Sequence, residues 1–208
     1  MKNNLIESYS QSYNKKGTVL IDKEQSVNPI NSTDLLQLLN CCNDVEKEFI
    51  KIGDAGEENN LLVGRFMTDV KKPEVVKNPY SQKVIEILSQ KKVFDIIKKI
   101  VGMNNDCYLR RIQFNQIDKN NFVGYHLDTD SNPDYIAACV LQLGDNYSGG
   151  KYRVYQKDGG HIDYRSGYGD LIISDCTYPH EVTKVESGNR KSLVFFISNH
   201  DGKNKRNN

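Results

Sequence analysis

The chain has 208 residues, of which 26% are charged and 38% hydrophobic, and 28 basic residues balance 27 acidic ones. This balance argues against nucleic acid as a partner, because proteins that bind it usually carry a basic excess to neutralise phosphates. No run of about 18 apolar residues is present and the start lacks an apolar signal-peptide core, so we expect a cytoplasmic protein without a membrane partner.

The first half of the chain shows the periodicity of amphipathic helices. Asn31 to Asp34 offer N-cap side chains, and apolar residues then recur at steps of three and four, which predicts a helix over residues 33–51. Gly53 to Asn60 is interpreted as a loop. Two more helices are predicted over residues 80–89 and 91–101, the second ending at a C-cap glycine, Gly102.

After Asn105 the apolar period changes to two, which is typical of β-strands. Turn sequences rich in Gly, Asn, Asp and Pro separate eight predicted strands, at residues 107–116, 121–127, 136–143, 151–156, 161–164, 170–174, 180–186 and 191–198. Many short strands at this spacing favour a sandwich or barrel. The five cysteines are odd in number and form no CxxC, so we expect reduced thiols with no catalytic role.

Two His-x-Asp triplets stand out among these strands. In an extended chain, residues i and i+2 point to the same side, so His126 and Asp128 aim an imidazole and a carboxylate at one point. His161 and Asp163 repeat the pattern. For this second pair the next histidine, His180, follows too closely to leave room for intervening strands, and we interpret the pair as the start of a strand.

His180 supplies a third ligand for the first triplet. Two histidines and one carboxylate on one side of a metal leave three coordination positions open, an arrangement that suits non-haem Fe(II) binding a co-substrate together with O2. Zinc competes for the same ligands, but a hydrolytic zinc site also needs a general base. Downstream, Arg190 and Ser192 share one face of a strand, where a guanidinium and a hydroxyl can hold the far carboxylate of 2-oxoglutarate.

Four segments together resemble the 2-oxoglutarate/Fe(II)-dependent oxygenase superfamily, and within it the prolyl-4-hydroxylase-like branch and its relatives that hydroxylate free amino acids. They are HLD at 126–128, YSGGKYRVY at 147–155, GDLIISD at 169–175 and HEVTKVESGNRKSLVFF at 180–196. The resemblance spans a little under half of the chain. It implies a double-stranded β-helix (jelly roll), iron ligation by His126, Asp128 and His180, and binding of 2-oxoglutarate by Arg190 and Ser192.

On this resemblance we expect a mainly β protein with a helical N-terminal half. Residues 1–104 form a helical support region of the same domain, residues 105–200 form the catalytic jelly-roll core buttressed by the helices, and residues 201–208 form a disordered tail. Prolyl hydroxylases of the family often place a Tyr beside the co-substrate on an early strand. Here Gln113 and Asn115 share a face of the corresponding strand and are expected to take that place.

The expected activity is hydroxylation of an unactivated C–H by Fe(II), 2-oxoglutarate and O2. Related halogenases replace the ligand Asp with a small residue, so Asp128 favours hydroxylation. A free amino acid is the leading substrate, with Tyr125, Asp130, Arg65 and Asn199 as candidate contacts; structural roles are the alternative for these residues. A peptidyl, prolyl-type substrate is the second choice, and a non-catalytic jelly-roll binding module is the third. The sequence leaves the oligomeric state open.

Overall fold

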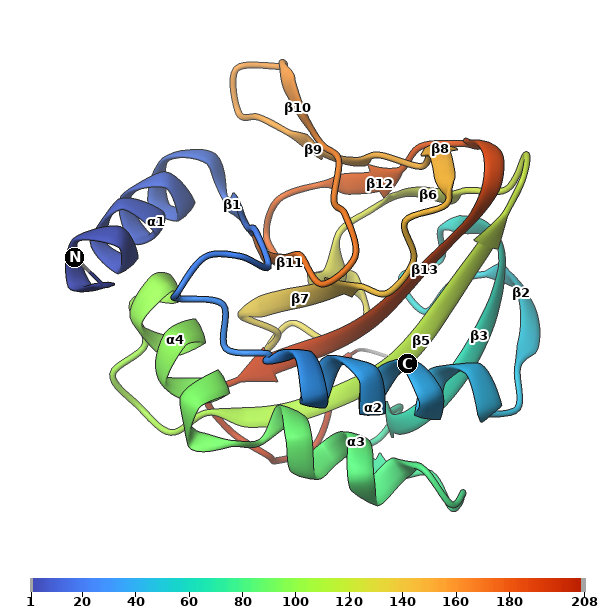
Figure 1. The fold of residues 1–208 in the computed structure, drawn as a ribbon, viewed down its shortest axis with the longest axis horizontal. Coiled ribbons are helices and arrows are strands. Elements are labelled where there is room, and N and C mark those ends of the chain that lie inside the picture. Colours follow the sequence, from blue (N-terminus) through green and yellow to red (C-terminus); the bar gives the residue numbers. More distant parts are fainter. Residues whose placement is uncertain (1, 207–208) are drawn as a thin grey trace.

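The computed structural model describes residues 2–206 as one antiparallel sheet of 13 strands that folds over on itself, accompanied by four α-helices (Figure 1). The helices are α1 (Lys2–Lys16), α2 (Ser32–Asp44), α3 (Ser81–Leu88) and α4 (Lys91–Val101), and a short 3-10 helix, η1, spans Asp128–Asp130. The strands are β1 (Thr18–Ile21), β2 (Glu48–Ile52), β3 (Glu58–Asp69), β4 (Pro73–Val75), β5 (Tyr108–Asp118), β6 (Val123–His126), β7 (Ala137–Gln142), β8 (Tyr147–Gly149), β9 (Tyr152–Tyr155), β10 (His161–Tyr164), β11 (Leu171–Asp175), β12 (His180–Val182) and β13 (Val185–Ser198).

The sheet has two parts that face each other across the site. The larger part has the order β1-β11-β7-β13-β5-β3, and the smaller part has the order β6-β12-β9-β10. They join where β3 pairs with β6, at Asn59 and Val123. The result is a nearly closed, jelly-roll-like β structure, which confirms the mainly β class that the sequence predicts.

Alternation along the long strand β13 separates the two sides of the larger part. Leu193 and Phe195 pack in a cluster with buried residues of the helices, whereas Val194 and Phe196 pack in a second cluster with residues of the smaller part. Because successive side chains of a strand point to opposite faces, even-numbered residues of β13 face the space between the two parts. Arg190 and Ser192 therefore point into that space.

The predicted helices α3 and α4 are present. In α4 the buried positions Val93, Ile96, Ile97 and Ile100 follow the three- and four-residue spacing of one helix face. Gly102 ends this helix with φ of 78°, a left-handed conformation that glycine adopts at little cost. Within residues 2–206, no helix combines the length and the apolar character that crossing a bilayer requires.

The prediction of a helical N-terminal half is wrong in part, because residues 1–104 also supply β1 to β4. The predicted helix 33–51 ends at Asp44, and its last residues belong to β2. The segment interpreted as a loop, 53–60, runs into β3, which lies between β5 and β6 in the sheet. The first half therefore builds part of the site itself.

The described part of the tail, which the sequence predicts to be disordered over residues 201–208, makes hydrogen bonds to the body of the protein. The Asn204 backbone N–H donates to the Lys71 carbonyl, and its side-chain amide donates to the carbonyls of Asp69 and Ser131. Residues 207–208 lie outside the described part of the chain. The tail thus packs beside the segment that follows Asp128.

Candidate active site

The three predicted metal ligands meet between the two parts of the sheet. His126 ends β6 and His180 begins β12, and the two residues are direct partners in the antiparallel ladder. Asp128 begins the 3-10 turn η1 that follows β6. One ligand atom from each of the three residues lies within 4.8 Å of the others. Strand pairing thus fixes the two imidazoles, and the turn brings the carboxylate between them.

Backbone carbonyls orient both imidazoles. The Nδ1 of His126 lies 2.8 Å from the Gly124 carbonyl, and the Nδ1 of His180 lies 3.1 Å from the Tyr178 carbonyl. Because a carbonyl only accepts, each Nδ1 is the donor in its contact, and Nε2 is the atom that holds the lone pair when the ring is neutral. A hydrogen bond from the distal nitrogen in this manner fixes the tautomer of metal-binding histidines.

The donor set fits a divalent cation. The Nε2 atoms of His126 and His180 lie 3.4 Å and 3.6 Å from the two carboxylate oxygens of Asp128. Ligands about 2.1 Å from a shared ion and at right angles are about 3 Å apart, so these separations need only a small contraction. The buried Asp128 Oδ2 has no hydrogen-bond partner among the described residues. The two imidazole Nε2 atoms and the unpartnered carboxylate oxygen together form a set of ligands suited to a cation.

The charges of the three residues are strongly coupled. Burial disfavours ionisation of Asp128, but the two imidazoles hold its pKa below the ordinary value. Burial likewise opposes protonation of His126, yet the adjacent Asp128 outweighs it and raises the His126 pKa to about 9. Burial lowers the pKa of His180 to about 4. A bound metal ion takes the place of the proton on His126 as the positive charge beside the Asp128 carboxylate.

Arg190 and Ser192 lie together on β13, both almost wholly buried. The guanidinium donates from Nη1 to the Ser192 hydroxyl at 3.1 Å, while its Nε and Nη2 have no partner among the described residues. Burial lowers the pKa of Arg190, because the charged form has lost its hydration. A buried cation without a counter-charge is costly, so this pair is suited to receive a carboxylate.

Gln113 and Asn115 line the same cavity from β5, as their shared face predicts, and Gln113 donates from Nε2 to the Asn115 Oδ1 at 2.9 Å. A tyrosine is nevertheless present at the site. Tyr152 of β9 is 3% exposed, its ring lies 5.0 Å from that of His180, and its hydroxyl has no partner among the described residues. Tyr152 lies in the segment 147–155, one of the four that carry the family resemblance. Nothing in the sequence, however, indicates that its side chain lies beside His180.

The candidate substrate contacts lie in different places. Arg65 lines the cavity from β3, with its Nε 2.7 Å from the Glu48 carboxylate. Tyr125, Asp130 and Asn199 are exposed and do not line the cavity. The ring of Tyr125 instead makes an edge contact with Tyr155, with centroids 5.0 Å apart. Of the four candidates, the structure therefore brings only Arg65 to the cavity.

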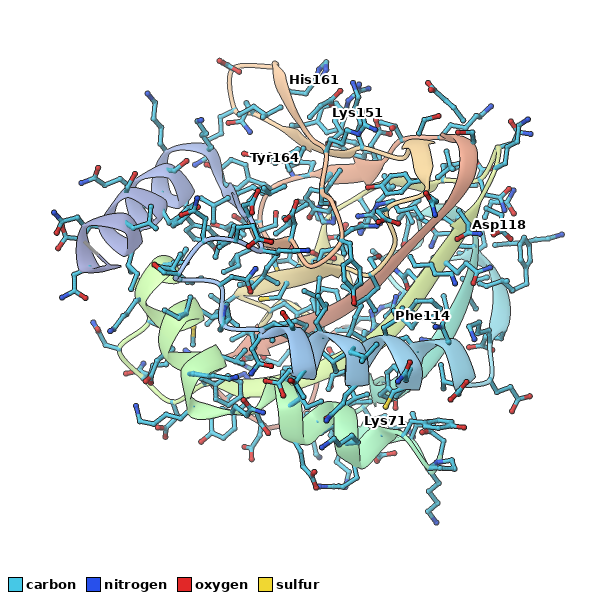
Figure 2. All side chains as sticks on the ribbon, viewed as in Figure 1. Lys71, Phe114, Asp118, Lys151, His161 and Tyr164 are labelled. Carbon is cyan, nitrogen blue, oxygen red and sulfur yellow. The ribbon has the colours of Figure 1, made fainter. Side chains whose placement is uncertain are left out.

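The second His-x-Asp triplet lies on β10, in the hairpin with β9 that projects from the body of the protein (Figure 2). Asp163 accepts two hydrogen bonds from Arg153, at 2.7 Å and 3.0 Å, and the His161 side chain is 47% exposed. Within residues 2–206 the group that gathers three metal-binding side chains is His126, Asp128 and His180. The structure thus supports the interpretation of His161 as the start of a strand.

Sequence reasoning missed a second cluster of charges in the cavity. Arg111 of β5 is 7% exposed and its guanidinium donates to the carboxylate of Asp54, in the turn between β2 and β3. Both residues line the cavity, together with Glu57 of the same turn. Strand alternation alone places Arg111 on the face of Gln113 and Asn115. Its partner Asp54 is distant in sequence and has no such signal.

Three comparisons show which known proteins this chain resembles. Residues 112–198 match the sequence model of the 2OG-Fe(II) oxygenase superfamily. A crystal structure of an oxidoreductase of the 2OG-Fe(II) oxygenase family from Burkholderia pseudomallei is 29% identical, with a TM-score of 0.89 over 97% of this chain and 94% of that one. No curated protein matches by sequence.

Two more distant structures share the fold. A prolyl-4-hydroxylase from Pseudomonas putida is 14% identical, with a TM-score of 0.63 over 94% of this chain and 99% of that one. An epimerase of nogalamycin biosynthesis, solved with Fe3+ and alpha ketoglutarate, is 10% identical, with a TM-score of 0.71 over 94% of this chain and 84% of that one. The sequence match over residues 112–198 and the near full-length likeness to the Burkholderia protein show that this chain is similar to the 2OG-Fe(II) oxygenase superfamily, whose members use Fe(II), 2-oxoglutarate and O2, and the group of His126, Asp128 and His180 fits that chemistry.

Proposed function

We propose that this oxygenase hydroxylates an unactivated C–H of a small polar substrate, with a free amino acid as the first choice. His126, Asp128 and His180 hold the iron in this proposal, and Arg190 with Ser192 holds the distal carboxylate of 2-oxoglutarate. The observation that carries it is the Arg190 guanidinium, which is 2% exposed and has two nitrogens without a described partner in the cavity that contains the metal cluster. A keto diacid satisfies both groups of residues, because its keto-acid end binds the metal and its distal carboxylate pairs with Arg190.

The protein's contribution is placement and the exclusion of water. Bound Fe(II) with 2-oxoglutarate and O2 supplies the oxidising power, and succinate and CO2 are the by-products. Arg190 and Ser192 fix the position of the co-substrate, because a guanidinium and a hydroxyl hold a carboxylate in a defined orientation. The buried hydroxyl of Tyr152 is available as a further donor. Apolar side chains of Val123, Val182 and Leu61 line the same cavity and keep it dry.

The preference for hydroxylation over halogenation depends on Asp128. A carboxylate in this position occupies a coordination site that a halide would otherwise take. Asp128 is 4% exposed and directed between the two imidazoles. With the carboxylate in place, a metal held by these three residues would supply hydroxylation chemistry and not halogenation.

Charges of both signs in the cavity support a small zwitterionic substrate. Arg65 and Arg111 line it with two cations, and Asp54 and Glu57 line it with two carboxylates. A free amino acid carries both complementary groups on one carbon. A residue inside a peptide carries neither, because both groups are part of amide bonds.

A peptidyl, prolyl-type substrate is the second candidate. The observation in its favour is the likeness of the fold to the Pseudomonas putida prolyl-4-hydroxylase over 94% of this chain. The charged residues inside the cavity count against it, since a peptide backbone offers no formal charge to neutralise them.

A mass-spectrometric screen tests the proposal. The purified protein, loaded with Fe(II), is incubated with 2-oxoglutarate and air against the 20 free amino acids and a matched set of blocked peptides. We expect a gain of one oxygen on a free amino acid, coupled to succinate. Oxygen gain on peptides alone contradicts the choice of substrate, a chlorinated product contradicts the reaction, and the absence of succinate in every reaction supports a binding module.

A further inference from the structure

A second anion site lies in the cavity, apart from Arg190. We infer that Arg65 and Arg111 bind the carboxylate of the substrate, and that Asp54 of the β2–β3 turn occupies this site until the substrate's carboxylate replaces it. The inference rests on the proposed function, whose substrate class it narrows to compounds with a free carboxylate. It also assigns Arg111 a role in specificity.

The geometry shows two guanidinium groups around one carboxylate. Arg111 donates from Nη2 to the Asp54 Oδ2, and Nη1 of Arg65 lies 3.9 Å from the same oxygen. The Arg111 guanidinium also lies over the ring of Phe196, with 5.6 Å between the guanidinium carbon and the ring centroid. Its Nε is buried and has no partner among the described residues. The site therefore has more hydrogen-bond donors than Asp54 satisfies.

The backbone positions of the two anion sites are well separated along the sheet. Arg111 pairs with Phe196 in the ladder between β5 and β13, whereas Arg190 lies six residues earlier on β13. At about 3.3 Å per residue, these positions are about 20 Å apart along the strand. A five-carbon diacid is much shorter than this. With Arg190 holding the co-substrate, Arg65 and Arg111 remain for a different anion.

Asp54 is well placed to leave the site. Its side chain is 37% exposed and it lies in a turn, Gly53 to Glu57, that projects beyond the paired residues of β2 and β3. Moving the turn breaks few sheet hydrogen bonds, and a partly exposed carboxylate regains hydration outside the cavity. Arg111, at 7% exposure, cannot regain water in the same way and so requires an anion. One carboxylate exchanges for another, and the guanidinium stays paired.

The surroundings of the site indicate the rest of the ligand. Ile50 and Ile52 of β2 line the cavity, and Ile52 is 65% exposed, so the entrance is apolar. Glu57 lines the same region and offers a carboxylate to an ammonium group. An α-amino acid with an apolar side chain matches a guanidinium pair, a carboxylate and an apolar entrance.

Binding measurements with matched acids and amides test the inference. The iron-loaded protein with 2-oxoglutarate is titrated anaerobically, by calorimetry, with L-leucine, L-isoleucine and L-proline and with the carboxamide of each. We expect at least one acid to bind at least tenfold more tightly than its amide. Arg111→Gln should remove this preference. It should weaken binding of the acid tenfold or more and leave the Kd of the amide within twofold of the wild-type value. Asp54→Asn strengthens binding of the acid severalfold, because the resident carboxylate has lost its charge.

Two controls separate the possible failures. Arg153→Gln removes a guanidinium paired to Asp163 on the β9–β10 hairpin, outside the cavity, and should leave the preference unchanged. Arg111→Lys keeps a cation and should restore part of the preference if Arg111→Gln folds poorly. Equal binding of acids and amides, or no binding of any acid, overturns the inference. Succinate formation with O2 and each of these compounds and the other free amino acids is measured alongside, and its absence in every reaction of the unmodified protein contradicts the proposed function instead.

Discussion

Arg190 donates a hydrogen bond to Ser192 two residues later on β13, and this is the one hydrogen bond of its guanidinium within residues 2–206. The pair lines the cavity and is buried, and the co-substrate carboxylate is proposed to bind there. A buried guanidinium with free donors is prepared for an anion before the anion arrives, which lowers the cost of ordering on binding.

Arg190→Gln should weaken binding of 2-oxoglutarate. Hydrogen bonds to a charged group contribute about 1.5–3 kcal/mol, so the KM for 2-oxoglutarate should rise by roughly 10- to 150-fold. Ser192→Ala removes one neutral donor and should raise the KM for 2-oxoglutarate by less than Arg190→Gln does, since a neutral hydrogen bond contributes about 0.5–1.5 kcal/mol. Steady-state succinate formation at varied 2-oxoglutarate measures both. An unchanged KM in Arg190→Gln places the co-substrate elsewhere.

Asp128→Ala should weaken iron binding, because it removes the carboxylate between the two imidazoles. We expect the loss in equilibrium binding of Fe(II) under anaerobic conditions, measured by competition with a chelating dye. His161→Ala is the matched control, since it removes the histidine of the rival triplet on β10. A loss of iron in His161→Ala with full retention in Asp128→Ala inverts the assignment.

The fully buried ion pair between Arg110 and Asp69 predicts a large effect on stability. The guanidinium binds the carboxylate through two hydrogen bonds of 3.0 Å, and Asn132 donates to the same carboxylate at 2.8 Å. Arg110→Met leaves Asp69 buried and unpaired, which should lower the free energy of unfolding by about 3–5 kcal/mol. Urea unfolding measures this. The double variant Arg110→Met/Asp69→Leu should recover part of the loss, and a loss below about 1 kcal/mol in the single variant contradicts a buried pair.

Asp134 should make stability depend on acidic pH. Burial raises its pKa, but the hydrogen bond from Lys205 and the His200 imidazole 2.8 Å away outweigh this and lower the pKa below the ordinary value. A carboxyl group with a depressed folded-state pKa stabilises the protein above its unfolded-state pKa, about 3.9, and loses this contribution as the pH falls through the folded-state pKa. Wild-type protein should therefore be more stable than Asp134→Asn at pH 7. Unfolding measured from pH 7 to pH 3 should show the difference shrinking below about pH 4, and a constant difference contradicts the pairing.

The candidate metal site was predictable from sequence because strand geometry is local. His126 and Asp128 follow a two-residue spacing, and Arg190 and Ser192 repeat it on β13. That His180 joins them depends on the pairing of β6 with β12, which the order and spacing of the motifs indicated through the family resemblance. The structure brings these residues into one cavity, although the predicted strand 180–186 ends at Val182 and β13 already begins at Val185, ahead of the predicted start at residue 191.

The parts of the site that come from the first half were not predictable in the same way. The apolar spacing of α2 continues through Val45 to Phe49, so the pattern alone does not show that the helix ends at Asp44. β3 carries a register shift between Arg65 and Met67, which interrupts the two-residue period by which a strand is recognised. The pairing of Asp54 with Arg111 joins residues from separate strands and a turn, and only the folded chain brings them together.

The most direct test of the proposed iron and co-substrate site is a titration of 2-oxoglutarate into the anaerobic Fe(II) protein, followed by the weak visible charge-transfer band of the metal–keto-acid complex. We predict a saturable band in the wild-type protein, at least a tenfold higher midpoint in Arg190→Gln, and a weakened band in Asp128→Ala. A wild-type protein that gives no band, or variants whose titrations coincide with the wild type, would contradict the assignment of His126, Asp128, His180 and Arg190.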